Sequence, residues 1–175
     1  MTARQYEETL ELSKEQLSDI SNSLGGAKSI PKKYIPTRLS KKDEKKQKKQ
    51  IIQSRKLYNK KIYLTRKKVK SFKSKKSNHI LNAEKIYKTK IIPSKKLSRK
   101  TGCNIKALKQ IVKKGQGAYF SSGSRPNQTA HSWGYARLAS SISGGKAAAV
   151  DFNILEKGCN KNSKALKLAF KSKNK

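Results

Sequence analysis

The chain has few acidic and few apolar residues for its 175 positions. It contains 10 Asp and Glu against 44 Lys and Arg, so its formal net charge is +34. Hydrophobic residues make up 34%, below the roughly 45–50% of typical globular domains. The chain is therefore limited to a small core. A charge this large opposes compaction unless nucleic acid, an anionic membrane surface or acidic protein faces supply the opposite charge.

Other absences exclude whole classes of protein. No stretch approaches the roughly 20 consecutive apolar residues that cross a membrane, and the polar, acidic N-terminus is unlike a signal peptide. Two cysteines, Cys103 and Cys159, are too few for a disulfide scaffold. We therefore expect synthesis in a reducing compartment, the cytosol or the nucleus. A disulfide between the two after release into an oxidising environment stays open, because sequence does not give their geometry.

The sequence also has little that supports catalysis. Cys103, Cys159, His79 and His131 lack the close Cys-x-x-Cys pairing of zinc sites, so we expect no metal. No P-loop, dinucleotide fingerprint or clustered carboxylate pair is present, and no third residue orients a Cys–His pair. We expect no enzyme, no cofactor and no small-molecule substrate.

Charge divides the chain into four regions. Residues 1–30 have net charge −2 and predict an acidic helix with a linker, whereas residues 31–114 have net charge +28. Residues 115–158 have net charge +2 and predict a neutral module. Residues 159–175 have net charge +6 and predict a mobile basic tail.

Helix signals recur through the first two regions. Leucines at positions 10, 17 and 24 predict an amphipathic helix that docks on a partner or on its own domain. Ser40, with Asp43 three residues later, predicts a helix from Ser40 to Tyr58. A further helix is expected from His79 to Tyr87, where apolar residues line one face.

Between Lys60 and Lys76, apolar and aromatic residues alternate irregularly with basic ones. Such a segment suits a surface along phosphates, with the stems packed and the charged ends in solvent. A solvated, partly disordered arm is the alternative. The candidate polyanion-binding residues in and after this segment are Arg66, Lys67, Lys68, Lys70, Lys73, Lys75, Lys76, Lys113 and Lys114.

Residues 94–114 have the spacing of a helix-turn-helix unit, in which Pro93 and Ser94 open the first helix, Gly102 lies at the turn and Asn104 caps the second helix. In such units the start of the second helix faces base edges. Here that helix presents Asn104, Lys106, Ala107 and Gln110. An ordinary helical hairpin is the alternative. Gly115 and Gly117 are expected to end the second helix.

The neutral module begins with a Gly/Ser loop and continues as an apolar helix over 130–142 and a final helix over 147–155. Arg125 and Arg137 flank Trp133, and loop hydroxyls precede a helix N-terminus, an arrangement that favours anions. The three residues predict a partner or anion pocket. Burial of Trp133 in the core is the alternative.

Several stretches carry a resemblance to a known family. They are Tyr34–Asp43, Arg66–Phe72, His79–Ala83, Gly117–Thr129 with its string Ser-Gly-Ser-Arg-Pro-Asn-Gln-Thr, Ser132–Ser141 and Gly144-Gly145-Lys146. Together they resemble an uncharacterised domain family of nucleocytoplasmic large DNA viruses, such as those of algae and amoebae, over about residues 31–160. The family has no established activity. The resemblance implies a virion component among minor capsid proteins, at the internal membrane or with the genome.

We therefore expect a mostly α protein, a small helical domain with extended lysine-rich segments and flexible termini. The expected function is that of a structural virion protein, a minor capsid or inner-shell component inside the capsid. Its partners would be other capsid proteins and a polyanion, either DNA or an anionic membrane surface. The alternative is a DNA-binding protein for packaging or transcription that acts through residues 94–114.

Overall fold

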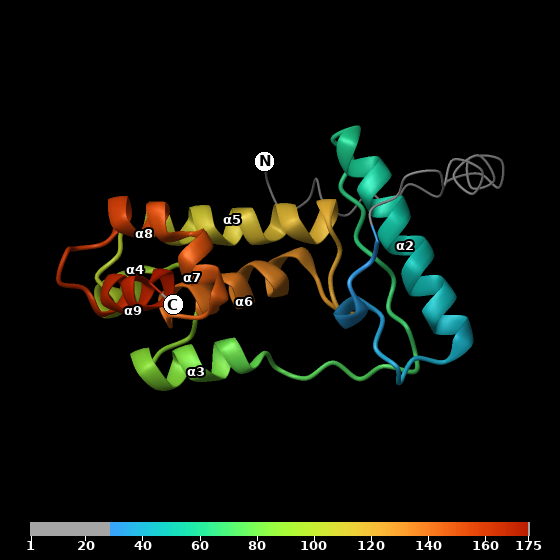
Figure 1. The fold of residues 1–175 in the computed structure, drawn as a ribbon, viewed down its shortest axis with the longest axis horizontal. Coiled ribbons are helices and arrows are strands. Elements are labelled where there is room, and N and C mark those ends of the chain that lie inside the picture. The colour runs from blue at the N-terminus through green and yellow to red at the C-terminus, as the bar shows by residue number, and fades with distance from the viewer. Residues whose placement is uncertain (1–28, 175) are drawn as a thin grey trace. The chain divides into compact units, whose positions relative to one another are not determined.

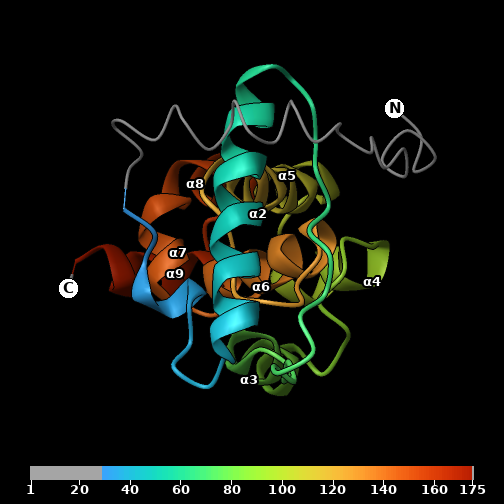
Figure 2. The same cartoon turned by 90° about the vertical axis from the view of Figure 1, so that its right-hand side faces the viewer.

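The computed structural model describes residues 29–174, which are mostly helical, as expected. The predicted acidic helix in residues 1–30 falls almost wholly outside this range. Within it the chain forms a short 3₁₀ helix and eight α-helices (Figures 1 and 2), with these bounds: η2 Lys32–Tyr34, α2 Lys41–Asn59, α3 Asn78–Tyr87, α4 Lys95–Thr101, α5 Ile105–Ser121, α6 Ala130–Ile142, α7 Lys146–Val150, α8 Phe152–Gly158 and α9 Lys164–Lys173.

The chain divides into two compact units whose borders differ from those of the four charge regions. Unit 1 contains the described residues up to Ser74 together with Ala118–Thr129, and unit 2 contains Lys75–Gly117 together with Ala130 onwards. Helix α5 starts in unit 2, and its last residues belong to unit 1.

Local capping signals account for the starts of several helices. The Ser40 hydroxyl accepts a hydrogen bond from the Asp43 amide at 3.2 Å and begins α2. Ser94 caps α4 in the same way. The Asn104 side chain accepts from the Ala107 amide at 2.7 Å at the start of α5. Each cap satisfies an amide that has no partner inside its helix, and all three were predicted.

Unit 2 has an apolar core. Leu97, Leu108, Leu138, Ile142 and Leu155 are completely buried in one cluster. Helix α6 runs through the unit and contacts α3, α7 and α9 (Figure 1). The core thus joins helices from both ends of the unit's sequence.

Unit 1 has a more polar interior. Its buried apolar residues are Tyr34, Leu39, Ile51, Val69, Tyr119 and Phe120. Gln47, also buried, donates to the carbonyl oxygens of Tyr34 and Ser124 at 3.2 and 3.1 Å. Because buried polar groups are costly unless hydrogen-bonded, these bonds fix how η2, α2 and the 118–129 segment pack.

Three predicted boundaries were wrong. Gly115 and Gly117 do not end α5, which continues to Ser121. A Cβ on Gly115 would lie 2.6 Å from the Cα of Gly134, so glycine is needed there for the close approach of α5 and α6. The expected helix over 147–155 is two helices, α7 and α8, which meet at the buried Asp151.

The third wrong boundary is the tail. Residues 164–173 form α9 instead of a mobile segment. Ser163 caps this helix, and Ala165 and Ala169 are completely buried. Lys164, Lys167 and Lys171 are spaced i, i+3 and i+7 and share an exposed side of the helix. Helix α9 is therefore amphipathic despite its basic composition.

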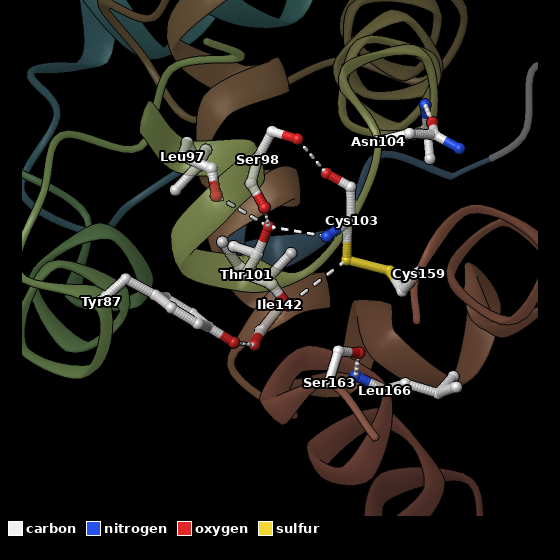
Figure 3. The surroundings of a disulfide bond; sticks show 11 residues. Tyr87, Leu97, Ser98, Thr101, Cys103, Asn104, Ile142, Cys159, Ser163 and Leu166 are labelled. Atoms are coloured by element: carbon white, nitrogen blue, oxygen red, sulfur yellow. Dashed lines mark hydrogen bonds between the residues drawn. A yellow bond between two sulfur atoms is a disulfide. The ribbon is translucent and has the colours of Figure 1, made fainter. Parts of the chain in front are cut away.

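Cys103 and Cys159 form a disulfide bond (Figure 3), which settles the alternative that the sequence left open. It links the α4–α5 turn to the α8–α9 turn. Two backbone hydrogen bonds bracket it, from the Asn104 amide to the Gly158 carbonyl at 2.7 Å and from the Asn160 amide to the Gly102 carbonyl at 2.8 Å. The bond closes a loop with a sequence separation of 56.

Removal of this cross-link is expected to destabilise unit 2. A disulfide that closes a loop of this size contributes about 4 kcal/mol in the loop-entropy account, and typical disulfides contribute about 2–4 kcal/mol. The C103A/C159A variant should therefore unfold at lower denaturant concentration than the oxidised wild type. Chemical unfolding followed by circular dichroism measures the difference. Reductant should move the wild-type transition to that of the variant and leave the variant unchanged. A wild-type transition that ignores reductant would contradict this.

Candidate polyanion-binding surface

The segment that follows α2 is extended and has an inward side chain at every third position. Arg66 and Val69 are buried and Phe72 is half-buried, whereas Lys67, Lys68, Lys70 and Lys73 are exposed. A period of three is typical of an extended, polyproline-like chain without internal hydrogen bonds. Figure 2 shows this segment returning along α2.

Side chains of unit 1 hold the backbone of this segment in place. Gln50 of α2 brackets Lys67, since its oxygen accepts from the Lys67 amide and its nitrogen donates to the Lys67 carbonyl. Asn127 brackets Val69 in the same way, with distances of 2.8 and 3.0 Å, and also donates to the Phe72 carbonyl. Both amides supply the partners that a neighbouring strand would supply.

Asp43 fixes the far end of the segment. Its carboxylate accepts from the amide and the hydroxyl of Ser71, each at 2.7 Å. The hydrogen bonds from Ser71 hold the pKa of Asp43 below its usual value. One of the few carboxylates of the chain therefore orders backbone instead of pairing with a lysine.

Arg66 lies in the interior of unit 1 with 8% of its surface exposed. Its guanidinium donates to the Ser54 hydroxyl, the Tyr119 carbonyl and the Ser124 hydroxyl at 3.2, 2.9 and 2.7 Å. It also lies 3.7 Å from the centroid of the Tyr119 ring. Burial lowers the pKa of Arg66.

The interior position removes Arg66 from the predicted surface cations. A guanidinium with three acceptors and an aromatic face is anchored without any carboxylate. The bonds it makes from the extended segment to α2 and to the 118–129 segment give it a structural role. Sequence spacing alone does not distinguish this arginine from the lysines that follow it.

The exposed lysines of α2 and of the extended segment are here called the basic face. Lys42, Lys45 and Lys49 recur at i, i+3 and i+7 and share one exposed side of α2. The Lys46 ammonium, beside them on the helix, donates to the Lys68 carbonyl at 2.9 Å and so joins α2 to the extended segment. The basic face consists of Lys42, Lys45, Lys46, Lys49, Lys67, Lys68, Lys70 and Lys73.

Few carboxylates offset this charge. Among residues 29–174, ion pairs with carboxylates involve Lys48 with Glu44, Lys76 with Glu84, and Lys114 and Arg137 with Asp151. No residue of the basic face takes part. Of the remaining predicted cations, Lys75 and Lys76 belong to unit 2. Lys76 donates to Glu84 of α3 at 2.6 Å.

The predicted base-reading residues do share one surface of unit 2. Asn104, Lys106 and Gln110 line a hollow of about 340 Å³ together with Asn153 and Lys157 of α8. Lys113 is exposed further along α5.

Helix α8 limits access to the start of α5. A Cβ on Gly158 would lie 2.3 Å from the Ala107 Cβ, so the end of α8 touches the first turn of α5. Ala107, one of the residues predicted to face bases, is buried there. The start of α5 is thus flanked by a second helix.

The predicted pocket of Arg125, Trp133 and Arg137 is divided between the two units. Arg125 is exposed in unit 1, whereas Trp133 and Arg137 lie on α6 in unit 2. The Arg137 guanidinium donates to both carboxylate oxygens of Asp151, at 2.9 and 2.8 Å. Arg137 therefore forms an ion pair inside unit 2.

Asp151 is the centre of that internal network. Lys114 donates to one of its oxygens at 2.9 Å and the Ser141 hydroxyl to the other at 2.8 Å. Burial by itself would raise the pKa of Asp151, but the hydrogen bonds from Arg137, Lys114 and Ser141 hold it below its usual value. Lys114, predicted to contact a polyanion, thus stabilises the α7–α8 junction.

Between residues 29 and 174, no group of three or more His, Cys, Asp or Glu side chains is placed to hold a metal ion. No helix in the same range has the length and apolar character needed to cross a membrane.

The chain belongs to a family of unknown function, DUF5824, whose model matches residues 31–163. The match spans unit 1 from Pro31 onwards and unit 2 as far as Ser163, the residue before α9. No curated protein matches the chain, and no solved structure does.

Loss of the Asp151 charge is expected to destabilise unit 2. In the D151N variant, two cations lose their carboxylate in a buried site, which costs about 2–4 kcal/mol. Because the pKa of Asp151 is lower in the folded than in the unfolded chain, the carboxylate stabilises the fold above about pH 4, the unfolded value.

Chemical unfolding of wild type and D151N at a series of pH values measures both the cost and its pH dependence. The difference in unfolding free energy between wild type and D151N should be constant near neutral pH. It should shrink as the pH falls below about 4, since protonation then removes the charge from the wild type as well. A difference that stays the same at pH 2–3 would contradict the assigned role of this carboxylate.

Proposed function

We propose that the chain is a non-enzymatic structural protein that binds a polyanion through the basic face of unit 1. The observation that carries this proposal is the fixed backbone of the lysine-rich segment. Gln50, Asn127 and Asp43 hold it against its own unit, so its lysines project from an ordered support.

Order before binding matters for affinity. An unstructured lysine arm would lose backbone freedom on contact with phosphates, which costs about 1–2 kcal/mol per residue. The backbone of the extended segment is already ordered in the folded protein. Binding therefore loses little further backbone entropy, and more of the electrostatic attraction contributes to affinity. The many like charges on α2, which repel one another, also favour a partner of opposite sign.

We also propose that unit 2 docks to neighbouring proteins. Leu81, Ile92, Val150 and Phe170 are large apolar residues with 42 to 67% of their surface exposed. Unit 2 also carries the disulfide, the internal network at Asp151 and most of the apolar core. These features suit unit 2 to contacts within an assembly.

The assembly we infer is the virion of a large DNA virus, with the chain as a minor capsid or inner-shell component. This setting rests on the family resemblance of residues 31–160. The disulfide is consistent with it, because disulfides persist in particles outside the cell and are rare in cytosolic proteins. The polyanion would then be the genome or the internal membrane.

The alternative is sequence-specific DNA binding by α5. The common surface of Asn104, Lys106 and Gln110 favours it. Against it stands the contact of α8 with the first turn of α5, because a major groove about 12 Å wide admits a single helix. We therefore prefer the basic face as the polyanion site.

Matched charge removal tests the choice between the two surfaces. In the first variant Lys67, Lys68 and Lys70 become Gln; in the second Lys106, Lys109 and Lys113 become Gln. Both lose three exposed cations. The first should weaken binding to mixed-sequence duplex DNA at every salt concentration and lower the salt slope by about 2–3, near 0.9 for each lost phosphate contact. The second should stay close to wild type. The reverse order would favour α5.

The virion setting has its own test. Mass spectrometry of purified virions, before and after removal of DNA at high salt, should find the chain with the emptied shells. Absence from virions would overturn the structural proposal. Complete loss with the DNA would overturn the capsid part of it and leave genome binding.

A further inference from the structure

The hollow of unit 2 between the start of α5 and α8 has no part in the proposed function. Its volume of about 340 Å³ is at the lower end of the roughly 300–1,000 Å³ of small-molecule sites. Figure 1 shows α8 beside the start of α5. The contact of Gly158 with Ala107, which limits access of a duplex to α5, lies at the edge of this hollow. The hollow is therefore better suited to a small molecule than to a double helix.

The two helices that form the hollow are joined beside it. Cys103 directly precedes Asn104, which lines the hollow (Figure 3). Its disulfide partner Cys159 directly follows Gly158, which lines the hollow as well. The Asn104 amide also donates to the Gly158 carbonyl at 2.7 Å. Because a site that is already ordered loses little freedom on binding, these links favour a ligand that enters a preformed hollow.

Two lysines and no acidic residue are among the described residues that line the hollow. Lys106 comes from α5 and Lys157 from α8, and both are exposed. Neither takes part in the ion pairs with carboxylates found within residues 29–174. A phosphate monoester, with a charge of about −1.5 to −2 at pH 7, matches two lysines better than a carboxylate with a single charge, and lysine is a common phosphate ligand.

Three carboxamides supply the other polar groups of the hollow, those of Asn104, Gln110 and Asn153. The Asn104 oxygen accepts from the Ala107 amide at 2.7 Å, so the nitrogen of this side chain is left to donate. Gln110 and Asn153 are exposed, and each carboxamide offers both a donor and an acceptor. Such groups pair with hydroxyls and with the edges of nucleobases. The lining therefore suits a ligand that has a polar body as well as a phosphate.

We propose that this hollow binds a phosphate monoester of a polar small molecule, a nucleotide or a sugar phosphate. The phosphate lies at Lys106 and Lys157, and the rest of the ligand lies along Gln110 and Asn153. A bare phosphate is much smaller than the hollow and leaves the carboxamides of Gln110 and Asn153 to water. The site is separate from the basic face of unit 1, and the inference does not depend on the proposed function.

NMR titration of the isotope-labelled, oxidised full chain at about 150 mM salt, which screens exposed charges, tests this site. The probes are adenosine monophosphate, glucose 6-phosphate and inorganic phosphate. Signals of residues 104–110 and 153–158 should shift, whereas those of residues 67–73 should not. One of the two esters should bind at least about threefold more tightly than inorganic phosphate, since a neutral hydrogen bond contributes a factor of about two to ten. The tighter ester identifies the class of ligand.

Two double variants of equal charge separate the site from the general charge of the chain. K106Q/K157Q should weaken binding of the preferred ester at least about tenfold, because hydrogen bonds to charged groups are the stronger ones. K109Q/K113Q removes two exposed lysines of α5 that do not line the hollow, and it should bind like wild type. Gln110→Leu should weaken the ester about two- to tenfold and leave inorganic phosphate unchanged.

An equal loss in the two double variants would overturn the inference, because binding would then follow net charge alone. Signal shifts confined to the basic face, or no shifts at the hollow with any probe, would overturn it too. Inorganic phosphate that binds as tightly as both esters would contradict recognition of a polar body. The K67Q/K68Q/K70Q variant, which tests the basic face, should bind the ester like wild type, so the two proposals stand or fail separately.

Discussion

The shortage of carboxylates is the constraint on which the rest of this structure depends. With ten acidic residues for forty-four basic ones, the fold cannot neutralise its cations by pairing. Asp43 and Asp151 lie inside, where one orders the Ser71 backbone and the other joins α7 and α8 to Arg137 and Lys114. Arg66 is held by neutral oxygens and a ring instead. Within residues 29–174, the lysines of the basic face take no part in the ion pairs with carboxylates.

The two units are stabilised in different ways. Unit 2 gathers the apolar core and is locked by the Cys103–Cys159 disulfide. Unit 1 has a small, polar interior in which side-chain amides replace strand pairing. This construction lets a segment with few apolar residues remain ordered, because each amide satisfies backbone groups that solvent would otherwise compete for. The side-chain amides thus fix the positions of the lysines although unit 1 has only a small apolar core.

Much of the helical structure could be predicted from sequence because its signals are local. Ser40, Ser94 and Asn104 cap their helices as expected, and α6 has the predicted bounds. The misses arise from distant contacts. Gly115 continues its helix because Gly134 lies against it, and α7 and α8 separate where Asp151 meets two cations. These partners lie elsewhere in the sequence, so the residues next to Gly115 and Asp151 do not predict them.

At the candidate site, the sequence predicted a lysine-rich segment but not the residues that hold it in place. Composition identified the lysine-rich segment, and the structure places four of its lysines on the basic face. Composition did not identify Gln50 and Asn127, which are ordinary polar residues until the fold brings them to the segment. It also did not separate Arg66 and Lys114, which serve internal contacts, from cations that project into solvent.

Lysine acetylation footprinting tests the central claim most directly. The full chain is acetylated briefly with and without mixed-sequence nucleic acid containing single- and double-stranded regions, and modification at each lysine is read by mass spectrometry. The account predicts protection of Lys42, Lys45, Lys49, Lys67, Lys68 and Lys70, with Lys106, Lys109 and Lys113 modified equally in both samples. Protection confined to the α5 lysines, or spread evenly over all lysines, would contradict it.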